Sequence, residues 1–358
     1  MKGLTFILTD KCNITCDFCA PNCGPKIKGA LSAETMIRVY DEMSSLMPVA
    51  NVVFTGGEPT LYINDVVKVI QHIKKDGVSS RIVTNAYWGK TEKLARRFLT
   101  KLKNAGLYEF NFSVDDFHQK YISYEAIKRA TELALEYEFP VLLAHKTYPD
   151  SESDISTFEA LLDRTIPIYE DLTPDEKDKH KLCFSSGNTI PVGRGIDTID
   201  VNKWVPSNLP RSYWEGPCDE VLRNITVQSD GSVSPCCGLV DRGLGVFYYG
   251  SVYEKSIPQL ISKANSSTLY NWLALEGPEG LMNAILEKST NEKFHGTYLQ
   301  NCQLCQEIFS SEQKMKILID CIPEKVNDLS AKRMNHEVHR SLYKSKTKPN
   351  IYMTATCQ

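Results

Sequence analysis

The chain has 358 residues, of which 42% are hydrophobic and 24% are charged, and its net charge is −3. This length and apolar content suffice for one large domain with a smaller one beside it, and they argue against a disordered chain. Lys and Arg scattered through a weakly acidic chain do not favour nucleic acid as a partner, and no apolar run approaches the roughly 20 residues of a membrane-spanning helix. We therefore expect a soluble, cytoplasmic protein with no membrane segment.

The first half of the chain alternates apolar runs with amphipathic stretches. The apolar runs predict six buried strands, at residues 3–9, 51–56, 80–85, 108–114, 140–148 and 181–188. The amphipathic stretches predict helices at 33–47, 64–76, 91–105, 117–138 and 154–163. Regular alternation of strand and helix indicates right-handed crossovers and a parallel sheet.

The pattern changes near residue 191, where Gly, Pro, Trp and short apolar runs begin. Residues 223–236 predict a hairpin that turns at Asp230-Gly231, and further helices are expected near 256–264, 278–288 and 303–318. Residues rich in Lys and Arg near the end predict a loosely held basic tail. The expected division is a first domain at 1–200, a second at 201–325 and the tail at 326–358.

The twelve cysteines fall into two groups and two single positions, Cys183 and Cys357. One group is N-terminal and the other C-terminal: Cys12, Cys16, Cys19 and Cys23, then Cys218, Cys236, Cys237, Cys302, Cys305 and Cys321. Cysteines at short spacings in a cytosolic protein are typical of metal binding or redox chemistry. Two metal sites are the simplest interpretation.

Cys12, Cys16 and Cys19 have spacings that let three thiolates converge from one loop. In a cubane iron–sulfur cluster they would hold three irons and leave the fourth iron open to another ligand. A zinc site completed by Cys23 or a distant His is the alternative. The second strand runs into "TGGEPTL" (55–61), a segment whose two glycines let a backbone approach a ligand closely and whose glutamate adds a carboxylate.

Cys-x3-Cys-x2-Cys after a first strand, followed by Gly-Gly-Glu-Pro after a second, resembles the radical S-adenosylmethionine (radical SAM) enzymes over about residues 3–190. The resemblance implies a partial (β/α)6 TIM-like barrel in which Cys12, Cys16 and Cys19 ligate a [4Fe–4S] cluster that binds SAM at its open iron. It also implies cofactor contacts, in chain order, from Phe18 (adenine), Gly56, Gly57 and Glu58 (amino group), Asn85, Ser113 and Asp115 (ribose and methionine), and Arg194 (carboxylate). Asp116 and His118, just after the fourth strand, and His145 and Lys146, at the end of the fifth, are weaker candidates for the site.

The second cysteine group brackets the predicted hairpin. Cys218 and Cys236 flank it, and Cys302 and Cys305 form a Cys-x2-Cys at the start of a helix, so four thiolates can form one cluster site or one zinc site. The pattern "GPC…SDGSVSPC…NCQLC" resembles the α+β twitch domain, a shortened relative of the SPASM domain that binds one auxiliary [4Fe–4S] cluster. Cys321 is left open as a replacement for one of the four ligands.

Cys237 directly follows one of these presumed ligands and has no ligand role of its own. It is either a bystander thiol or a hydrogen-atom donor, since an S–H bond is weaker than the C–H bond it would make. Donation to the face opposite the abstraction inverts a carbon radical, and here the chain resembles radical SAM epimerases that convert L- to D-residues in ribosomally made peptides. Because the first strand starts near residue 3, the barrel and the twitch region are expected to hold the peptide themselves.

Three functions follow from these observations. The first is epimerisation of a ribosomally made precursor peptide, with electrons supplied by a donor such as flavodoxin or ferredoxin. The second keeps the cofactor but changes the outcome to dehydrogenation or to a thioether or carbon–carbon cross-link in a peptide. The third, from another class, is a non-catalytic iron–sulfur scaffold or electron-transfer protein.

Overall fold

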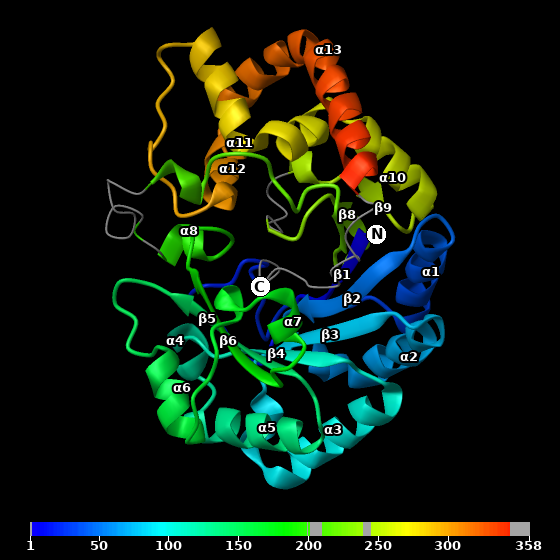
Figure 1. The fold of residues 1–358 in the computed structure, drawn as a ribbon, viewed down its shortest axis with the longest axis vertical. Coiled ribbons are helices and arrows are strands. Elements are labelled where there is room, and N and C mark those ends of the chain that lie inside the picture. The colour runs from blue at the N-terminus through cyan, green and yellow to red at the C-terminus, as the bar shows by residue number, and fades with distance from the viewer. Residues whose placement is uncertain (1, 199, 201–209, 239–244, 344–358) are drawn as a thin grey trace.

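A computed structural model of the chain describes residues 2–198, 200, 210–238 and 245–343. Its centre is an open nine-stranded sheet in the order β6-β5-β4-β3-β2-β1-β7-β8-β9, with helices packed around it (Figure 1). The strands are β1 (Lys2–Thr9), β2 (Val49–Gly56), β3 (Ser79–Thr84), β4 (Glu109–Ser113), β5 (Val141–Thr147), β6 (Leu182–Asn188), β7 (Asn224–Val227), β8 (Ser232–Ser234) and β9 (Gly250–Ser251). The first six are parallel, each beside the one before it, which confirms the parallel sheet of a partial TIM-like barrel.

The helices follow the predicted alternation, but two of the predicted helices are each divided. They are α1 (Ala33–Ser44), α2 (Ile63–Ile73), α3 (Glu92–Ala105), α4 (Asp116–Gln119), α5 (Tyr124–Glu136), α6 (Ile155–Leu162), α7 (Pro174–Lys177), α8 (Gly195–Thr198), α10 (Ile257–Ser266), α11 (Thr268–Lys288), α12 (Asn301–Phe309) and α13 (Glu312–Tyr343). The single helix expected at 117–138 is two, because Ser123 caps a new helix by accepting the N–H of Ala126 at 3.3 Å. The helix expected at 303–318 is likewise divided at Ser311, whose hydroxyl accepts the N–H of Lys314.

The predicted hairpin extends the same sheet beyond the barrel strands. β7 pairs in parallel with β1, with Gly3 opposite Asn224, and β8 returns antiparallel to β7. The turn between them needs Gly231, whose φ of +83° lies in the left-handed region that favours glycine. The segment that carries the second cysteine group is therefore joined to the barrel through the sheet itself.

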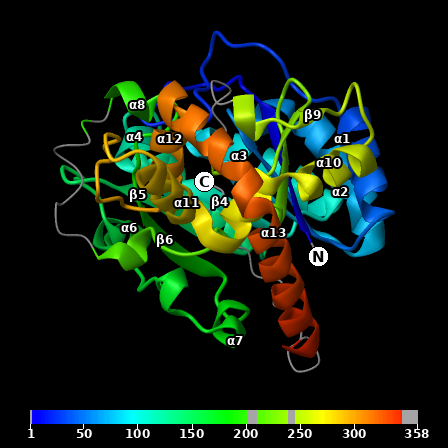
Figure 2. The ribbon, with the colours of Figure 1, turned by 90° about the horizontal axis from the view of Figure 1, so that it is seen from above.

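Residues 326–343 are not part of a loose tail but continue α13, which corrects the expected start of the tail at 326. The first half of α13 packs on α11, with Leu329 only 3% exposed, and Lys325 and Lys332 both pair with Glu276 of α11. These contacts hold a helix that the charged composition alone does not predict. Figure 2 shows the far end of α13 projecting past the rest of the fold. The rest of the expected tail, 344–358 with Cys357, lies outside the described residues.

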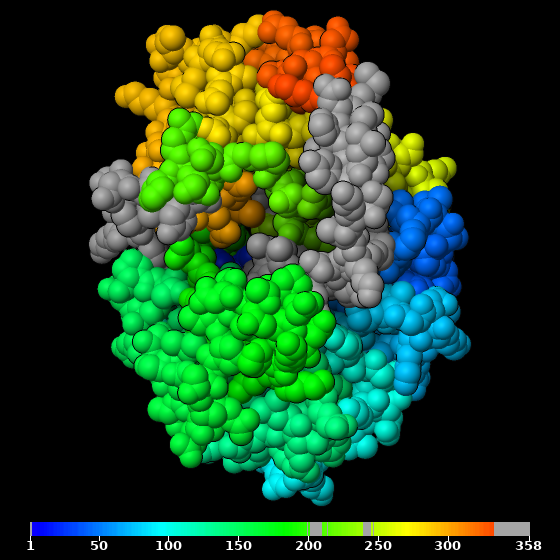
Figure 3. Space-filling model, in the orientation of Figure 1, coloured from blue at the N-terminus to red at the C-terminus, as the bar shows by residue number. Residues whose placement is uncertain are grey.

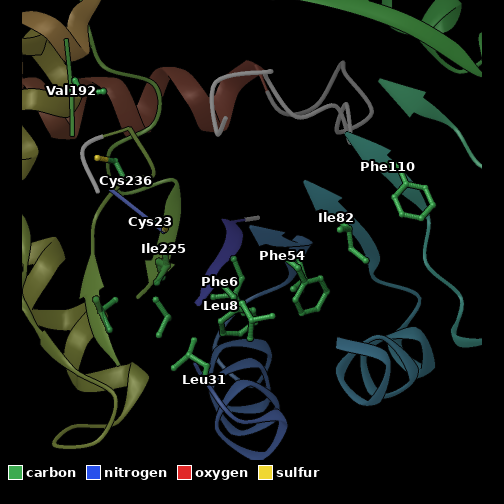
Figure 4. Packing of buried hydrophobic residues seen from close by; sticks show 14 of the residues in the cluster. Phe6, Leu8, Cys23, Leu31, Phe54, Ile82, Phe110, Val192, Ile225 and Cys236 are labelled. Carbon is green, nitrogen blue, oxygen red and sulfur yellow. The ribbon is translucent and has the colours of Figure 1, made fainter. Parts of the chain in front are cut away.

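One face of the sheet carries the hydrophobic core. Phe6, Phe54, Ile82 and Phe110 are register partners on β1 to β4, all are fully buried, and Figure 4 shows this row across the strands. Successive side chains of a strand point to opposite faces, so this row leaves the alternate residues for the inner face of the barrel. The outer face packs against helices, and this packing fixes the position of each strand along its own axis. The positions of the strands determine where their carboxyl ends meet.

We expect Phe54→Ala to destabilise the fold by about 3–5 kcal/mol, because it removes a fully buried ring and leaves a cavity in this row. Urea unfolding followed by circular dichroism measures the change. Leu46→Ala is the control, because Leu46 is 48% exposed and a surface truncation usually changes the free energy of unfolding by about 0.5 kcal/mol or less. Equal losses in the two variants would contradict this account of the core.

Candidate functional site

A cavity lies at the carboxyl ends of the barrel strands and brings most of the predicted site residues together. We call it the cysteine cavity. Figure 3 shows the molecule hollowed between the green and orange parts of the chain, with blue N-terminal residues visible inside the hollow. The predicted residues that line the cysteine cavity are Cys12, Cys16, Phe18, Cys19, Gly56, Gly57, Asn85, Ser113, Asp115 and Cys237. His118, Lys146 and Cys23 line it as well.

The loop that carries the first three cysteines is held by its own backbone. Cys12 N–H donates to the carbonyl of Gly24 at 3.2 Å, and Gly24 N–H donates to the carbonyl of Asp10 at 3.1 Å, so the two ends of the loop are paired. Cys12 and Cys16 are buried, at 8% and 6% exposure. Burial raises the pKa of the Cys12 thiol to about 12. A buried group of this kind becomes a thiolate when a cation binds it, which is the chemistry of a metal centre.

Cys23 contacts one of the three cysteines of the loop, Cys19. Its N–H donates to Sγ of Cys19 at 3.2 Å. A hydrogen bond from the Cys23 side chain also lowers the pKa of Cys19 to about 7. Hydrogen bonds to ligand sulfurs tune the potential of an iron–sulfur cluster, so Cys23 is placed to support Cys19. The short Cys19-x3-Cys23 spacing is the one sequence signal that could have indicated it.

The two glycines of the Gly-Gly-Glu motif approach the cysteine loop rather than open space. Gly57 N–H donates to the carbonyl of Thr9 at 2.6 Å, and a Cβ at Gly57 would lie 2.1 Å from the carbonyl oxygen of Lys11. Gly56 has a φ of +123°, which a residue with a side chain rarely adopts. The glycines therefore fasten the end of β2 to the loop that presents Cys12.

Glu58, which is expected to contact the amino group of SAM, is not among the residues that line the cysteine cavity. Its carboxylate is fully buried and accepts four hydrogen bonds: from the N–H and hydroxyl of Thr60, the hydroxyl of Thr84 and the N–H of Asn85. Burial raises its pKa above the ordinary value. In this structure Glu58 ties the ends of β2 and β3 together.

Arg194, which is expected to pair with the carboxylate of SAM, makes its hydrogen bonds in this structure with the cysteine loop. Its guanidinium donates to the carbonyls of Cys16, at 2.5 Å, and Cys23, and to Oδ1 of Asn22 at 3.1 Å. Its N–H donates to the carbonyl of Cys19 at 3.1 Å. The turn leaves these carbonyl oxygens available as hydrogen-bond acceptors. The sequence does not show which of them Arg194, 171 to 178 residues later in the chain, will contact. Arg194 holds the cysteine loop closed.

Asn85, Asp115 and His118 form a polar wall of the cysteine cavity. Asn85 Nδ2 donates to Oδ1 of Asn13 at 2.9 Å, and Asp115 Oδ1 lies 2.7 Å from His118 Nδ1. Burial alone would lower the pKa of His118, but the carboxylate of Asp115 and the sulfur of Cys16 outweigh it and raise this pKa well above the ordinary value. Asp115 also caps α4, so one carboxylate fixes both the helix and the imidazole.

Lys146 on β5 is a cationic member of the same wall, although its position in the sequence is equally typical of a polar strand end outside the site. Its side chain lines the cysteine cavity, and burial lowers the pKa of its ammonium group. A cation that is costly to bury is best stabilised by an anionic or carbonyl group in the cavity. Hydrophobic periodicity could not single it out, because alternation predicts only which face a strand residue occupies.

The four predicted ligands of the second group share one neighbourhood. Burial raises the pKa values of Cys302 and Cys305, and the sulfurs of Cys218 and Cys236 raise them further. Cys321 lies apart, with its thiol 3.2 Å from the carbonyl of Ile317 and 3.8 Å from that of Ala284, between α13 and α11. The structure thus brings together the four cysteines first chosen and not Cys321.

Cys237 lies where the two cysteine groups meet. It lines the cysteine cavity, and its Sγ lies 3.8 Å from Oε2 of Glu220. Cys237 is disulfide-bonded in this structure, whereas the other cysteines of the described residues are free thiols. Its neighbour Cys236 lies with the second cysteine group, so these two consecutive side chains lie in two different environments.

Within the described residues, no three His, Cys, Asp or Glu side chains converge closely enough to surround one metal ion. Thiolates that bind different irons of one cluster need a wider arrangement than the ligands of a single ion. We therefore treat both cysteine groups as candidate cluster sites. None of the described helices is long and apolar enough to cross a lipid bilayer.

Gly57→Ala should disrupt the site, because its Cβ would collide with the Lys11 carbonyl and displace Cys12. We expect a loss of about 1–3 kcal/mol in the free energy of unfolding and a reduced iron content after anaerobic reconstitution. Gly24→Ala in the same loop is the matched control, since a Cβ there meets nothing closer than 3.9 Å. Normal iron content in Gly57→Ala would refute this role of the glycine.

Comparison with known proteins agrees with this geometry. The model of the radical SAM superfamily matches residues 6–161. Among curated proteins, "Putative peptide biosynthesis protein YydG" of Bacillus subtilis (strain 168) is 21% identical over 319 residues, which cover 88% of this chain and 94% of that protein. The "GTP 3',8-cyclase" of Synechococcus elongatus is 29% identical over 239 residues, which cover 61% of this chain and 68% of the cyclase.

Among solved structures, HydG, a maturase of the [FeFe]-hydrogenase, aligns with 97% of this chain and 83% of its own chain at 11% identity, with a TM-score of 0.26. A score this low supports no conclusion about the fold.

Proposed function

The chain carries a radical SAM domain, and we propose that it uses this domain to convert an L-residue of a ribosomally made peptide to its D-form. A peptide substrate is supported by YydG, whose name assigns it to peptide biosynthesis and which this chain matches over 94% of its length. The inversion is supported by one observation above all, the presence of Cys237 in the same cavity as Cys12, Cys16 and Cys19.

The residues present fit two iron–sulfur clusters. Cys12, Cys16 and Cys19 would hold one, and Cys218, Cys236, Cys302 and Cys305 an auxiliary one in a twitch-like domain over about residues 201–325. The first, when bound, would supply the electron that cleaves SAM to a 5′-deoxyadenosyl radical, the species that removes the hydrogen atom. The buried thiols of both groups suit this purpose, since their raised pKa values make bound cations the natural counterpart of their thiolates.

The polar wall of the cysteine cavity would orient SAM and the peptide. Asn85, Ser113 and Asp115 supply hydrogen-bonding groups toward SAM, and Phe18 supplies an apolar surface for its adenine. The ammonium group of Lys146 would donate a hydrogen bond to a backbone carbonyl of the peptide. Arg194 and Glu58 act one step removed, by holding the cysteine loop and the strand ends in place.

Cys237 would end the reaction. Its S–H bond breaks as a new C–H bond forms at the α-carbon of the peptide, on the face opposite the one that lost hydrogen. The sulfur is left with an unpaired electron, and one electron and one proton restore the thiol. The electron comes from a reductant such as flavodoxin or ferredoxin in the cytoplasm.

The thiol form of Cys237 requires that its disulfide be reduced first. Reduction of the disulfide to two thiols takes two electrons and two protons, and the one-electron reductant that serves the cluster would supply the electrons in two steps. We expect inversion only after such reduction.

The test uses anaerobically reconstituted enzyme, a candidate peptide encoded by a small reading frame beside the gene, and D2O as solvent. Wild type should place one deuterium at an inverted α-carbon and otherwise keep the mass of the peptide. Cys237→Ala should still form 5′-deoxyadenosine but lose inversion, because radical formation does not need this thiol. D-amino-acid analysis and intact mass measure both outcomes.

Cys321→Ala is the matched control, since Cys321 is a buried thiol between α11 and α13, away from both cysteine groups. It should invert the peptide at the wild-type rate. Undiminished inversion in Cys237→Ala would exclude the donor role. A product lighter by two hydrogens, or cross-linked, would favour the dehydrogenase or cross-linking alternative. No 5′-deoxyadenosine with any reductant would favour a non-catalytic iron–sulfur protein.

A further inference from the structure

The cysteine loop forms a single layer of chain between the cysteine cavity and the outside of the molecule. Along its first part, alternate residues are buried and line the cysteine cavity, and the residues between them are exposed. The buried residues are Cys12, Ile14 and Cys16, and the exposed ones are Lys11, Asn13 and Thr15. The outer side of this layer therefore lies directly behind two of the proposed cluster ligands.

Three lysines, Lys11, Lys26 and Lys28, are exposed on the outside of this loop. A backbone bridge joins Lys11 to Gly24, and Lys26 follows Gly24 by two residues, so the three lysines lie close together in the loop. Ile27, between the last two, is 39% exposed and adds an apolar side chain. We call these three lysines and Ile27 the lysine face. Figure 2 shows the dark blue loop that carries them on the outside of the molecule, away from the far end of α13.

The positive charge of the lysine face is not balanced by the protein itself. Its lysines take part in no ion pair within the described residues, and the two carboxylates of the loop are engaged elsewhere. Asp17 pairs with Lys120, and Asp10, which is buried, accepts a hydrogen bond from Ser229 at 2.7 Å. The whole chain has a net charge of −3, so this positive surface is a local departure from its composition. An acidic surface on a partner would complement it and speed the encounter.

The position of the lysine face suits the delivery of an electron. Lys11 adjoins Cys12 in the chain, and Lys26 follows Cys23 by three residues. Because Cys23 N–H donates to Sγ of Cys19, the chain from Lys26 leads through one hydrogen bond to a second proposed ligand. Electron-transfer proteins form small, weak interfaces, and complementary charges steer their encounter. One exposed apolar side chain among lysines fits an interface of that kind.

We propose that the lysine face is the docking site of a small acidic electron-carrier protein of the flavodoxin type, which reduces the cluster held by Cys12, Cys16 and Cys19. Acidic side chains of the carrier lie against the lysines, and Ile27 contacts an apolar part of its surface. One electron passes from the reduced carrier to the cluster, so the carrier is oxidised by one electron, the cluster is reduced by one, and no bond forms or breaks. This inference rests on the proposed function, which requires the cluster, and adds the surface through which the cluster is reduced.

The experiment follows reduction of the reconstituted enzyme by reduced flavodoxin in stopped flow, through the iron–sulfur absorbance, with neither peptide nor SAM present. Lys26→Glu with Lys28→Glu should slow the second-order step about tenfold at low salt, because attraction between the two surfaces becomes repulsion. The wild-type rate should fall as salt screens the lysines, whereas the rate of this variant should not. Photoreduced deazariboflavin, a small uncharged donor, should reduce both proteins at the same rate.

Two further double variants locate the effect. Lys93→Glu with Lys316→Glu, at exposed positions on α3 and α13, makes the same change in net charge and should keep the wild-type rate with flavodoxin. Lys26→Gln with Lys28→Gln places no negative charge on the loop, so it preserves cluster assembly, and its rate should lie between those of wild type and the Glu pair. An unchanged flavodoxin rate in Lys26→Glu with Lys28→Glu, or an equal loss with deazariboflavin, would overturn the proposal.

Titration of isotope-labelled oxidised flavodoxin, followed by NMR, measures docking without electron transfer and should rank the variants in the same order. An enzyme that is reduced through the lysine face but never inverts a residue contradicts only the proposed epimerisation. One that inverts residues, while flavodoxin reduces every variant at the same rate, contradicts only the lysine face.

Discussion

The buried carboxylate of Glu58 is the interaction on which the site depends. A carboxylate removed from water is costly unless hydrogen bonds replace its hydration, and Glu58 receives four of them, from Thr60, Thr84 and Asn85. These donors belong to the end of β3 and to the segment that follows β2, so the two strand ends cannot separate without exposing the charge or leaving it unpaired. Gly57, next to Glu58, then meets the cysteine loop at a fixed height, and Asn85 enters the cysteine cavity beside Cys12.

The positions of the strands, the hairpin and the grouping of the cysteines could be predicted from the sequence, because each depends on local periodicity or spacing. The directions of Glu58 and Arg194 could not. Both carry groups that suit a ligand, but both meet protein partners first: backbone N–H and hydroxyl groups for the carboxylate, and open carbonyls of the cysteine loop for the guanidinium. Which partner a charged group meets depends on tertiary packing, and a single sequence does not show that packing.

Helix boundaries were missed for a related reason. The break between α4 and α5 depends on Ser123, a residue that also occurs within helices, and its capping role is visible only once its hydroxyl meets Ala126. The long α13 was not predicted, because its many charged residues indicated a solvated tail from residue 326 and the structure has a helix there. Glu276 of α11 provides the acceptor that makes Lys325 and Lys332 part of a packed helix. A local hydrogen bond to the Ser123 side chain determines where α5 begins. A partner far along the chain, Glu276, determines that α13 is a packed helix.

The two faces of the barrel sheet have different roles, because the outer face carries the hydrophobic core and the inner face lines the cavities. The outer row of Phe6, Phe54, Ile82 and Phe110 carries the core. The row one residue earlier on β1 to β4 is Thr5, Val53, Arg81 and Glu109, which are also register partners. Closed TIM barrels fill this space with bulky apolar side chains, whereas a polar row cannot pack against itself in the same way. The inner face of the open barrel therefore carries polar residues as well as Val53, and a cavity lies at each end of it.

Three consecutive residues, Cys236, Cys237 and Gly238, connect the second cysteine group with the cysteine cavity. Cys236 lies with the second cysteine group, Cys237 lines the cysteine cavity, and a Cβ at Gly238 would lie 2.7 Å from Sγ of Cys302. Glycine there is what lets Cys302 come close enough to share a site with Cys236. If Cys237 gives up a hydrogen atom as proposed, the sulfur that must be re-reduced belongs to the residue next to Cys236, which is a proposed ligand of an auxiliary cluster. Over this short covalent path, an auxiliary cluster at the second cysteine group would pass the electron that restores the Cys237 thiol. This would explain why the second cysteine group lies beside the cysteine cavity.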